Sequence, residues 1–150
     1  MSSVYVRDQI KTFLSAGLPS EKFLDLSGVY DVLEDYILDN GLTARDPWVG
    51  LEFVGGDESP VTVGSSNTSG KYRETGTVLI HVVDIAKLGA SNSILTRAET
   101  IRNLLRGKRI GSIIVDSVSA PNFGPGTTLE FEGGYTSAGF IISYEREYNL

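Results

Sequence analysis

Residues 72–116 constrain the fold most strongly, because they predict a strand, a helix and a second strand in succession. Residues 75–85 are rich in β-branched side chains and carry apolar residues on both alternating faces, as in a strand near the centre of a sheet. Residues 93–106 repeat apolar side chains at steps of three and four, which predicts an amphipathic helix. Gly107 stands where a left-handed residue would end that helix. Residues 111–118 predict the second strand.

Further helices and strands are expected on either side of this unit. Residues 3–16 and 28–40 show helical spacing, while residues 47–54, 127–132 and 136–148 alternate like strands. In the last strand one face is predicted to carry Ala138, Phe140, Ile142 and Tyr144. We therefore expect an α+β fold, with a mostly antiparallel sheet of about four strands, a long amphipathic helix packed on it and additional N-terminal helices.

The length of 150 residues predicts a single domain over residues 1–150. Residues 55–71 are rich in Gly, Ser and Asn, and such a stretch buries too little apolar surface to hold one shape, so we expect a flexible hairpin arm there. The chain contains no cysteine, which excludes disulfides, thiolate metal sites and a cysteine nucleophile. No leader and no long apolar run are found, so we expect an unprocessed cytoplasmic protein without a membrane span.

The charges are distributed unevenly along the chain, whose net charge is −6. Residues 21–58 contain ten acidic and two basic side chains, whereas residues 71–109 contain eight basic and three acidic ones. The acidic surplus argues against a general nucleic-acid binder. Two interpretations of the uneven distribution remain open: ordinary solvated helix faces, or an acidic face of one copy that meets the basic face of the next.

The sequence contains no convincing catalytic constellation. His81 is the only histidine, so neither a Ser-His-Asp triad nor a histidine-rich metal site can form, and a hydrogen-bonded, half-buried histidine is the expected state. Glu34 and Asp35 are adjacent on a predicted helix and point apart. Glu130 and Glu132 share a strand face, as a cation site or an acid/base pair would, but edge-strand charges explain them equally well. No phosphate-loop motif is present, so we expect no enzymatic activity.

Three runs carry a resemblance to a known family. They are Lys71-Tyr-Arg-Glu-Thr-Gly-Thr-Val-Leu-Ile-His-Val, Ala98-Glu-Thr-Ile-Arg-Asn-Leu-Leu-Arg-Gly-Lys-Arg-Ile and Ile114-Val-Asp-Ser-Val-Ser-Ala-Pro. Together with a last strand that starts near Tyr135, they resemble the tail terminator (tail completion) proteins of long-tailed bacteriophages. The resemblance covers about residues 70–148, and it does not extend to the helix expected at 28–40.

The resemblance implies a structural virion protein that closes as a six-membered ring on the last ring of the tail tube. Such a ring ends tail elongation and offers a docking face to the head–tail connector protein. The implied partners are other copies of the chain, the tail tube protein and the connector, with DNA passing through the lumen without specific binding. No cofactor and no membrane are implied, and assembly would take place in the host cytoplasm. Another neck or tail-tube subunit, or a monomeric small-ligand-binding α+β domain, remains an alternative.

Arg73 and Glu74 match the Arg-Glu entry to the family's central strand. Alternation sends their side chains to opposite faces, so one of them is expected to face a neighbouring subunit. Arg73 is favoured, because a guanidinium can hold a carboxylate through two hydrogen bonds and residues 31–39 supply several carboxylates. A merely exposed strand-edge charge is the alternative. The predicted interface residues are Arg73, Glu74, Asp31, Asp35, Arg97 and Arg102.

Overall fold

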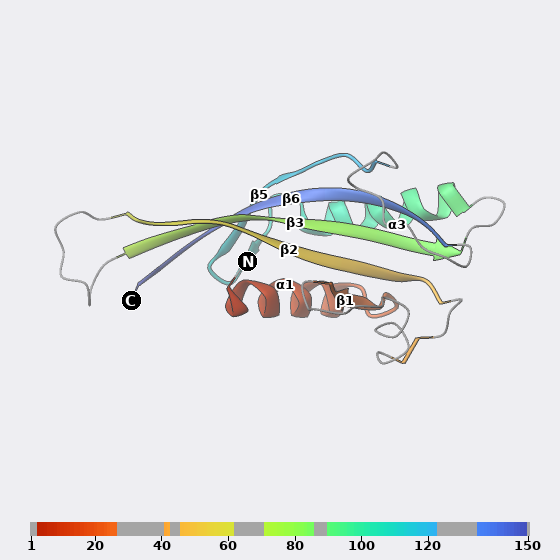
Figure 1. Cartoon of the computed structure of the whole chain (residues 1–150), viewed down its shortest axis with the longest axis horizontal. Coiled ribbons are helices and arrows are strands. Elements are labelled where there is room, and N and C mark those ends of the chain that lie inside the picture. The colour runs from red at the N-terminus through yellow and green to blue at the C-terminus, as the bar shows by residue number, and fades with distance from the viewer. Residues whose placement is uncertain are drawn as a thin grey trace.

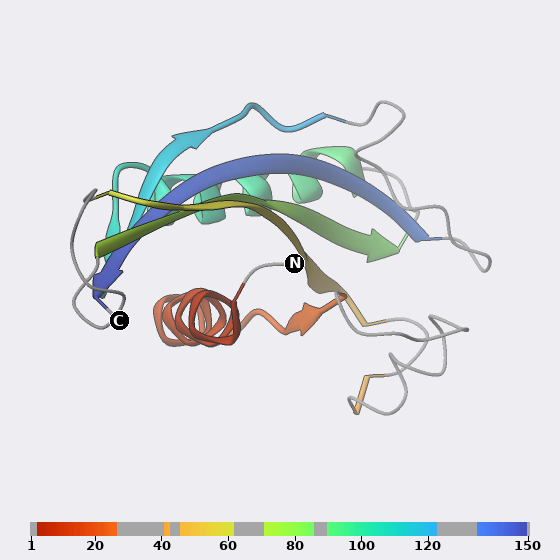
Figure 2. The ribbon, with the colours of Figure 1, turned by 60° about the vertical axis from the view of Figure 1, so that its left-hand side comes forward.

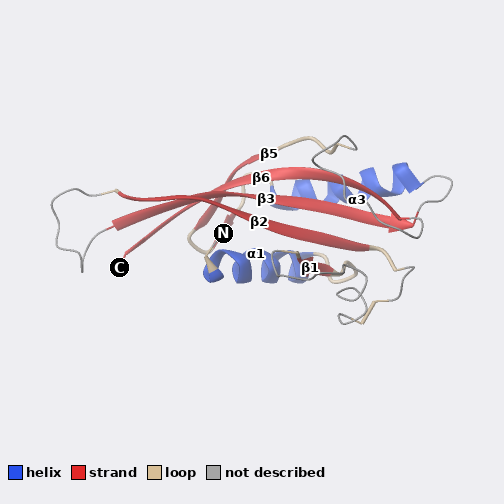
Figure 3. Cartoon of the chain, in the orientation of Figure 1, coloured by secondary structure: helices blue, strands red, loops and turns tan. Residues whose placement is uncertain are grey.

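The computed structural model describes residues 3–26, 41–42, 46–61, 71–85, 90–122 and 135–149. These residues form two helices and one sheet (Figure 1; Figure 3). The elements are α1 (Val4–Gly17), β1 (Phe23–Asp25), β2 (Trp48–Pro60), β3 (Lys71–Ile85), α3 (Ala90–Leu105), β4 (Arg109–Ile110), β5 (Ile113–Val118) and β6 (Tyr135–Asn149).

The sheet has six strands in the order β1-β2-β3-β6-β5-β4. β1 runs parallel to β2, and every other neighbouring pair is antiparallel. β3 lies near the centre and pairs along its whole length with β6, from Lys71 opposite Asn149 to Ile85 opposite Tyr135. Figure 2 shows the strands curving over α1, so the sheet resembles half of a barrel.

Both helices pack on the same face of the sheet, called here the inner face. Their buried side chains join those of alternate positions of β2, β3 and β6 in one apolar cluster. The members include Val6, Ile10 and Leu14 of α1, Ile94, Ala98, Ile101 and Leu105 of α3, and Val78, Ile80, Val82, Ala138, Phe140, Ile142 and Tyr144 of the strands. The four residues expected on one face of the last strand therefore share the buried face, and burial of such side chains is the main stabilising contribution.

The expected sheet of about four, mostly antiparallel strands is wrong. The sheet has six strands and is mixed, because two short edge strands are added. β1 contains three residues and β4 contains two, which is too short to produce a period-two pattern. The parallel pairing of Phe23–Asp25 with β2 depends on a contact between distant segments. The helix expected at 28–40 and the strand expected at 127–132 lie outside the described residues.

The region predicted as a hairpin arm begins as an extension of the sheet. Residues 55–60 belong to β2 and pair with β3, with an irregular register between Gly55 and Glu58. A Cβ atom on Gly56 would lie 2.2 Å from the carbonyl oxygen of Thr75, so only glycine permits this close approach. The glycines that suggested a loop therefore form a bulge within a strand. Residues 62–70 lie outside the described part of the chain, and their predicted flexibility stays a prediction.

Gly107 ends α3 as expected, with a φ of +66°. A Cβ atom at this position would have no neighbour within 4 Å, so a substitution tests the backbone conformation alone. We expect Gly107→Ala to lower the free energy of unfolding by about 1 kcal/mol, because an L side chain disfavours the left-handed region. Urea denaturation measures this loss, and Gly107→Asn should lose less because asparagine tolerates that region better. An alanine variant as stable as the parent would contradict the argument.

Candidate interaction surface

The face of the sheet opposite the helices, called here the outer face, carries an apolar strip at its centre. By register, Leu79 of β3 lies between Glu52 of β2 and Ile141 of β6. Val54, one row away, is 43% exposed, and Leu79 and Ile141 are partly exposed. Both described helices belong to the inner face, so neither covers this strip. Among the described residues, this strip is therefore available for contact with another molecule.

One end of the outer face is closed by contacts within the chain. His81 is only 3% exposed, and its Nε2 lies 3.1 Å from Oε2 of Glu52. Leu26 packs against Gly50, where a Cβ atom would lie 2.5 Å from the leucine Cδ1. His81 is hydrogen-bonded, as expected, but it is buried rather than half-buried. His81 is thus a packed histidine with a carboxylate partner.

The other end of the outer face, at the start of β3 and the end of β6, is charged. Glu147 forms ion pairs with Lys71 at 2.6 Å and with Arg73 at 2.7 Å. Hydrogen bonds from Lys71 and Arg73 lower the pKa of Glu147, and Glu147 raises the pKa of Arg73. Arg73 is exposed and Lys71 and Glu147 are half-exposed, so these pairs add little stability. Arg73 therefore lies on the outer face and has a carboxylate partner within its own subunit, and its predicted contact with a neighbouring subunit stays a prediction.

A depression of about 330 Å³ lies at this charged end. It is lined by Lys71, Arg109, Ser112, Ile114, Glu145 and Glu147. Within the described ranges, Arg109 and Glu145 make no ion pair or hydrogen bond through their side chains, and the same holds for nearby Asp116. These charges remain available to a partner.

Glu74 points to the inner face, where its carboxylate accepts hydrogen bonds from the N-terminus of α1. Its Oε1 accepts the backbone N–H of Ser3 at 3.0 Å, and its Oε2 accepts the Ser3 hydroxyl at 3.0 Å. The Tyr144 hydroxyl donates to Oε1 at 3.4 Å, and Arg146 lies 3.6 Å from Oε2. A carboxylate at this position also complements the positive end of the helix dipole. Glu74 is thus used inside the subunit.

Aromatic rings complete this group of side chains, called here the Glu74 cluster. The guanidinium carbon of Arg146 lies 3.9 Å from the ring centre of Tyr5 and 4.5 Å from that of Tyr148. Such cation–π contacts are strongest where water is excluded. The cluster consists of Ser3, Tyr5, Glu74, Tyr144, Arg146 and Tyr148.

Two other predicted interface residues also have partners within the subunit. Arg97 binds both carboxylate oxygens of Glu21, at 2.9 and 2.8 Å, and donates to the carbonyl of Val83 at 2.9 Å. Arg102 donates from Nε to the carbonyl of Ser119 at 2.7 Å. Both guanidiniums are thus hydrogen-bonded within one subunit, and their role at an interface stays a prediction. Asp31 and Asp35 lie outside the described residues.

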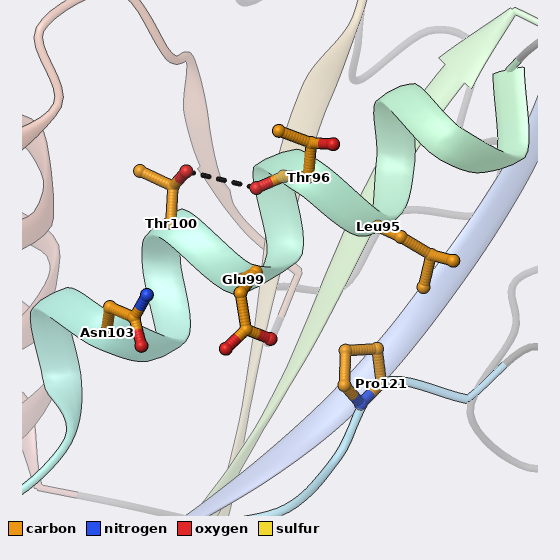
Figure 4. Close-up of a pocket in the computed structure, with 6 residues that line it drawn as sticks. All are labelled: Leu95, Thr96, Glu99, Thr100, Asn103 and Pro121. Atoms are coloured by element: carbon orange, nitrogen blue, oxygen red, sulfur yellow. Dashed lines mark hydrogen bonds between the residues drawn. The ribbon is translucent and has the colours of Figure 1, made fainter.

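A second depression, of about 540 Å³, lies between the exposed side of α3 and Pro121 (Figure 4). Its hydroxyls are occupied by the helix itself, since Thr100 donates to the carbonyl of Thr96 at 3.0 Å and Thr96 to that of Asn92 at 2.8 Å. Its one carboxylate, Glu99, forms ion pairs with arginines of the same helix. The hydroxyls and the carboxylate that line this depression are therefore already engaged within α3.

Within the residues that the structure describes, no group of three His, Asp or Glu side chains is arranged to hold a metal ion. The pair Glu130 and Glu132 falls outside the described ranges. Neither described helix has the length and apolar character needed to cross a membrane.

No family model matches the chain, and no curated protein matches it. One solved structure is similar over 99% of this chain and 97% of that chain, with 12% identity and a TM-score of 0.49. A likeness at this level supports no argument about function.

Sequence reasoning located Arg73 on an outward face but missed Leu79 and Ile141. Apolar residues on both faces of residues 75–85 suggested a strand covered on both sides. One signal in the sequence indicated that one face of β3 is open to solvent for part of its length. Alternate positions of this strand carry the polar side chains of Arg73, Thr75 and Thr77.

The Glu74 cluster predicts a large effect on stability. Glu74→Ala would leave the Ser3 N–H, the Ser3 hydroxyl and Arg146 without their carboxylate, so we expect the free energy of unfolding to fall by about 3 kcal/mol. Urea denaturation followed by circular dichroism measures the change. Glu145→Ala is the matched control, since a partly exposed glutamate without an ion pair among the described residues should change stability by less than about 0.5 kcal/mol. Equal effects of the two variants would refute the role of Glu74.

Tyr148 predicts a pH-dependent effect at the same end of the sheet. A hydrogen bond with Glu58, reinforced by burial, raises the pKa of Tyr148 to about 12. Because the folded pKa lies above the ordinary value of 10.0, the stabilisation is present below pH 10 and is lost as the pH rises through about 12. We expect Glu58→Gln to bring the pKa of Tyr148 back toward 10. NMR titration of ring-labelled tyrosine measures it, with Tyr148→Phe for assignment, and an unchanged pKa would exclude Glu58 as the cause.

Proposed function

We propose that the chain is a tail terminator protein, a structural virion subunit that forms a ring on the end of a tail tube. The ring ends tail elongation and provides the docking face for the head–tail connector. The observation that carries the proposal is the outer face of the sheet, where a partly exposed apolar strip adjoins charges that have no ion pair among the described residues. A surface of this kind suits contact with another protein better than it suits chemistry.

The residues that resemble the family support the proposal through their positions. In the Arg-Glu pair at the start of β3, Glu74 anchors α1 and Arg73 faces outward. Gly76, two residues further, leaves room for Tyr144, since a Cβ atom there would lie 2.6 Å from the tyrosine hydroxyl. In this motif, Glu74 fixes the N-terminus of α1 and Arg73 lies at the surface of the outer face.

The arrangement of the faces also suits a ring. A cyclic assembly of identical subunits uses two different patches of each subunit, one meeting the other across every interface. Here the sheet presents its outer face on one side, and the helices lie on the other side (Figure 2). In the proposed role the ring contacts the tail tube protein and the connector protein, surrounds DNA without specific binding, needs no cofactor and catalyses no reaction.

The test is the oligomeric state of the purified protein. We expect light scattering after size-exclusion chromatography to give a hexamer, and particle images to show a ring. High salt should weaken assembly, because charges are screened over about 8 to 10 Å at physiological ionic strength. Arg73→Glu should weaken it as well, whereas Lys22→Glu, which reverses an exposed charge near β1, should not.

A monomer at both low and high salt would overturn the proposal and favour a small-ligand-binding domain. A ring that stacks into tubes on its own would favour a tail-tube subunit instead.

A further inference from the structure

We propose that a neighbouring copy of this chain docks on the outer face of the sheet, through the exposed stripe of its helix α1. Leu79 and Ile141 lie at the centre of this contact, and Arg109, Asp116 and Glu145 lie at its rim. The inference rests on the proposed ring and specifies which surfaces join its subunits.

The centre of the contact is a continuous apolar strip across three strands. Leu79 and Ile141 are direct partners in the register of β3 and β6. Val54 of β2 lies opposite Thr77, in the next outer-face row. Cross-strand neighbours on one face lie within contact distance of each other. Removing these partly exposed side chains from water would stabilise an assembly.

The rim carries unpaired charges of both signs. Within the described ranges, Arg109 is a cation without an ion pair, and Asp116 and Glu145 are carboxylates without one. A nucleic acid or an anionic lipid surface would require a surplus of cations, which this rim lacks. A protein surface that carries both charges and an apolar residue fits it better.

Helix α1, which packs on the inner face, offers such a surface. Val4 is 69% exposed, and Asp8 and Lys11 are exposed and make no ion pair with another described residue. Positions 4, 8 and 11 lie on one side of a helix, facing away from the buried Val6, Ile10 and Leu14. Because α1 packs on the inner face, its stripe and the outer face point in different directions, as a head-to-tail ring requires.

The absence of cysteine makes a direct test possible. Single variants Leu79→Cys and Ile141→Cys would be labelled with a maleimide in the assembled ring and after dissociation by dilution. We expect labelling in the ring to be at least ~10-fold slower, because docking excludes the reagent. The control is Leu95→Cys on α3, whose parent residue is 37% exposed and outside the proposed contact, and its rate should change less than ~2-fold.

Charge reversal tests the rim. Arg109→Glu should raise the concentration of half-assembly by ~10-fold, whereas the matched Lys22→Glu should raise it less than ~2-fold. Adding Asp8→Lys to Arg109→Glu should restore part of the loss, since the two positions then carry opposite charges again.

The outcomes separate the two proposals. A parent protein that forms no ring overturns the proposed function and this inference with it. A ring in which Leu79→Cys and Ile141→Cys react as fast as in the monomer overturns only the assignment of the outer face. A ring with a protected outer face but no rescue by Asp8→Lys overturns the pairing with α1. If Leu79→Cys does not fold, Ile141→Cys decides the first of these comparisons.

Discussion

The contact between Glu74 and the N-terminus of α1 is the interaction on which the far half of this structure depends. The buried apolar cluster reaches Phe53, Val78 and Tyr144, and beyond these positions the described residues of β2, β3 and β6 include no buried apolar side chain. Polar and aromatic groups hold the strand ends instead. One carboxylate accepts two hydrogen bonds from Ser3 and faces Arg146, which lies between two tyrosine rings. A buried charge persists only where such partners are present.

Anchoring α1 on the inner face has a consequence for the opposite side. Both helices cover the same face of the sheet, so the outer face keeps a partly exposed apolar strip. The charges along its rim divide into two groups. Lys71 and Arg73 already satisfy Glu147, whereas Arg109, Asp116 and Glu145 have no ion pair among the described residues. This division separates charges that are paired within the subunit from those that would meet a second copy in the proposed ring.

Much of the central unit could be predicted from the sequence. The strand, helix and strand of residues 72–116 appear as β3, α3 and β5, and Gly107 ends the helix in the left-handed region as expected. The opposite directions of Arg73 and Glu74 also followed from alternation. The two short edge strands were missed, because three residues and two residues are too few for a periodic signal. The extension of β2 past Gly55 and Gly56 was missed as well, since a bulge uses the same residues as a loop.

Local sequence sets which side chains share a face, because the periods of strands and helices follow from backbone geometry alone. It also sets where a helix ends. The absence of cysteine and the single histidine exclude disulfides, thiolate metal sites and histidine-rich metal sites. Only the tertiary structure decides which face is covered and which charges are satisfied. Ser3 and Glu74 are 71 residues apart in the sequence. Leu79 and Ile141, which pair across β3 and β6, are also separated by a long segment of chain. Contacts over such distances depend on how the whole chain packs, and no local pattern encodes them.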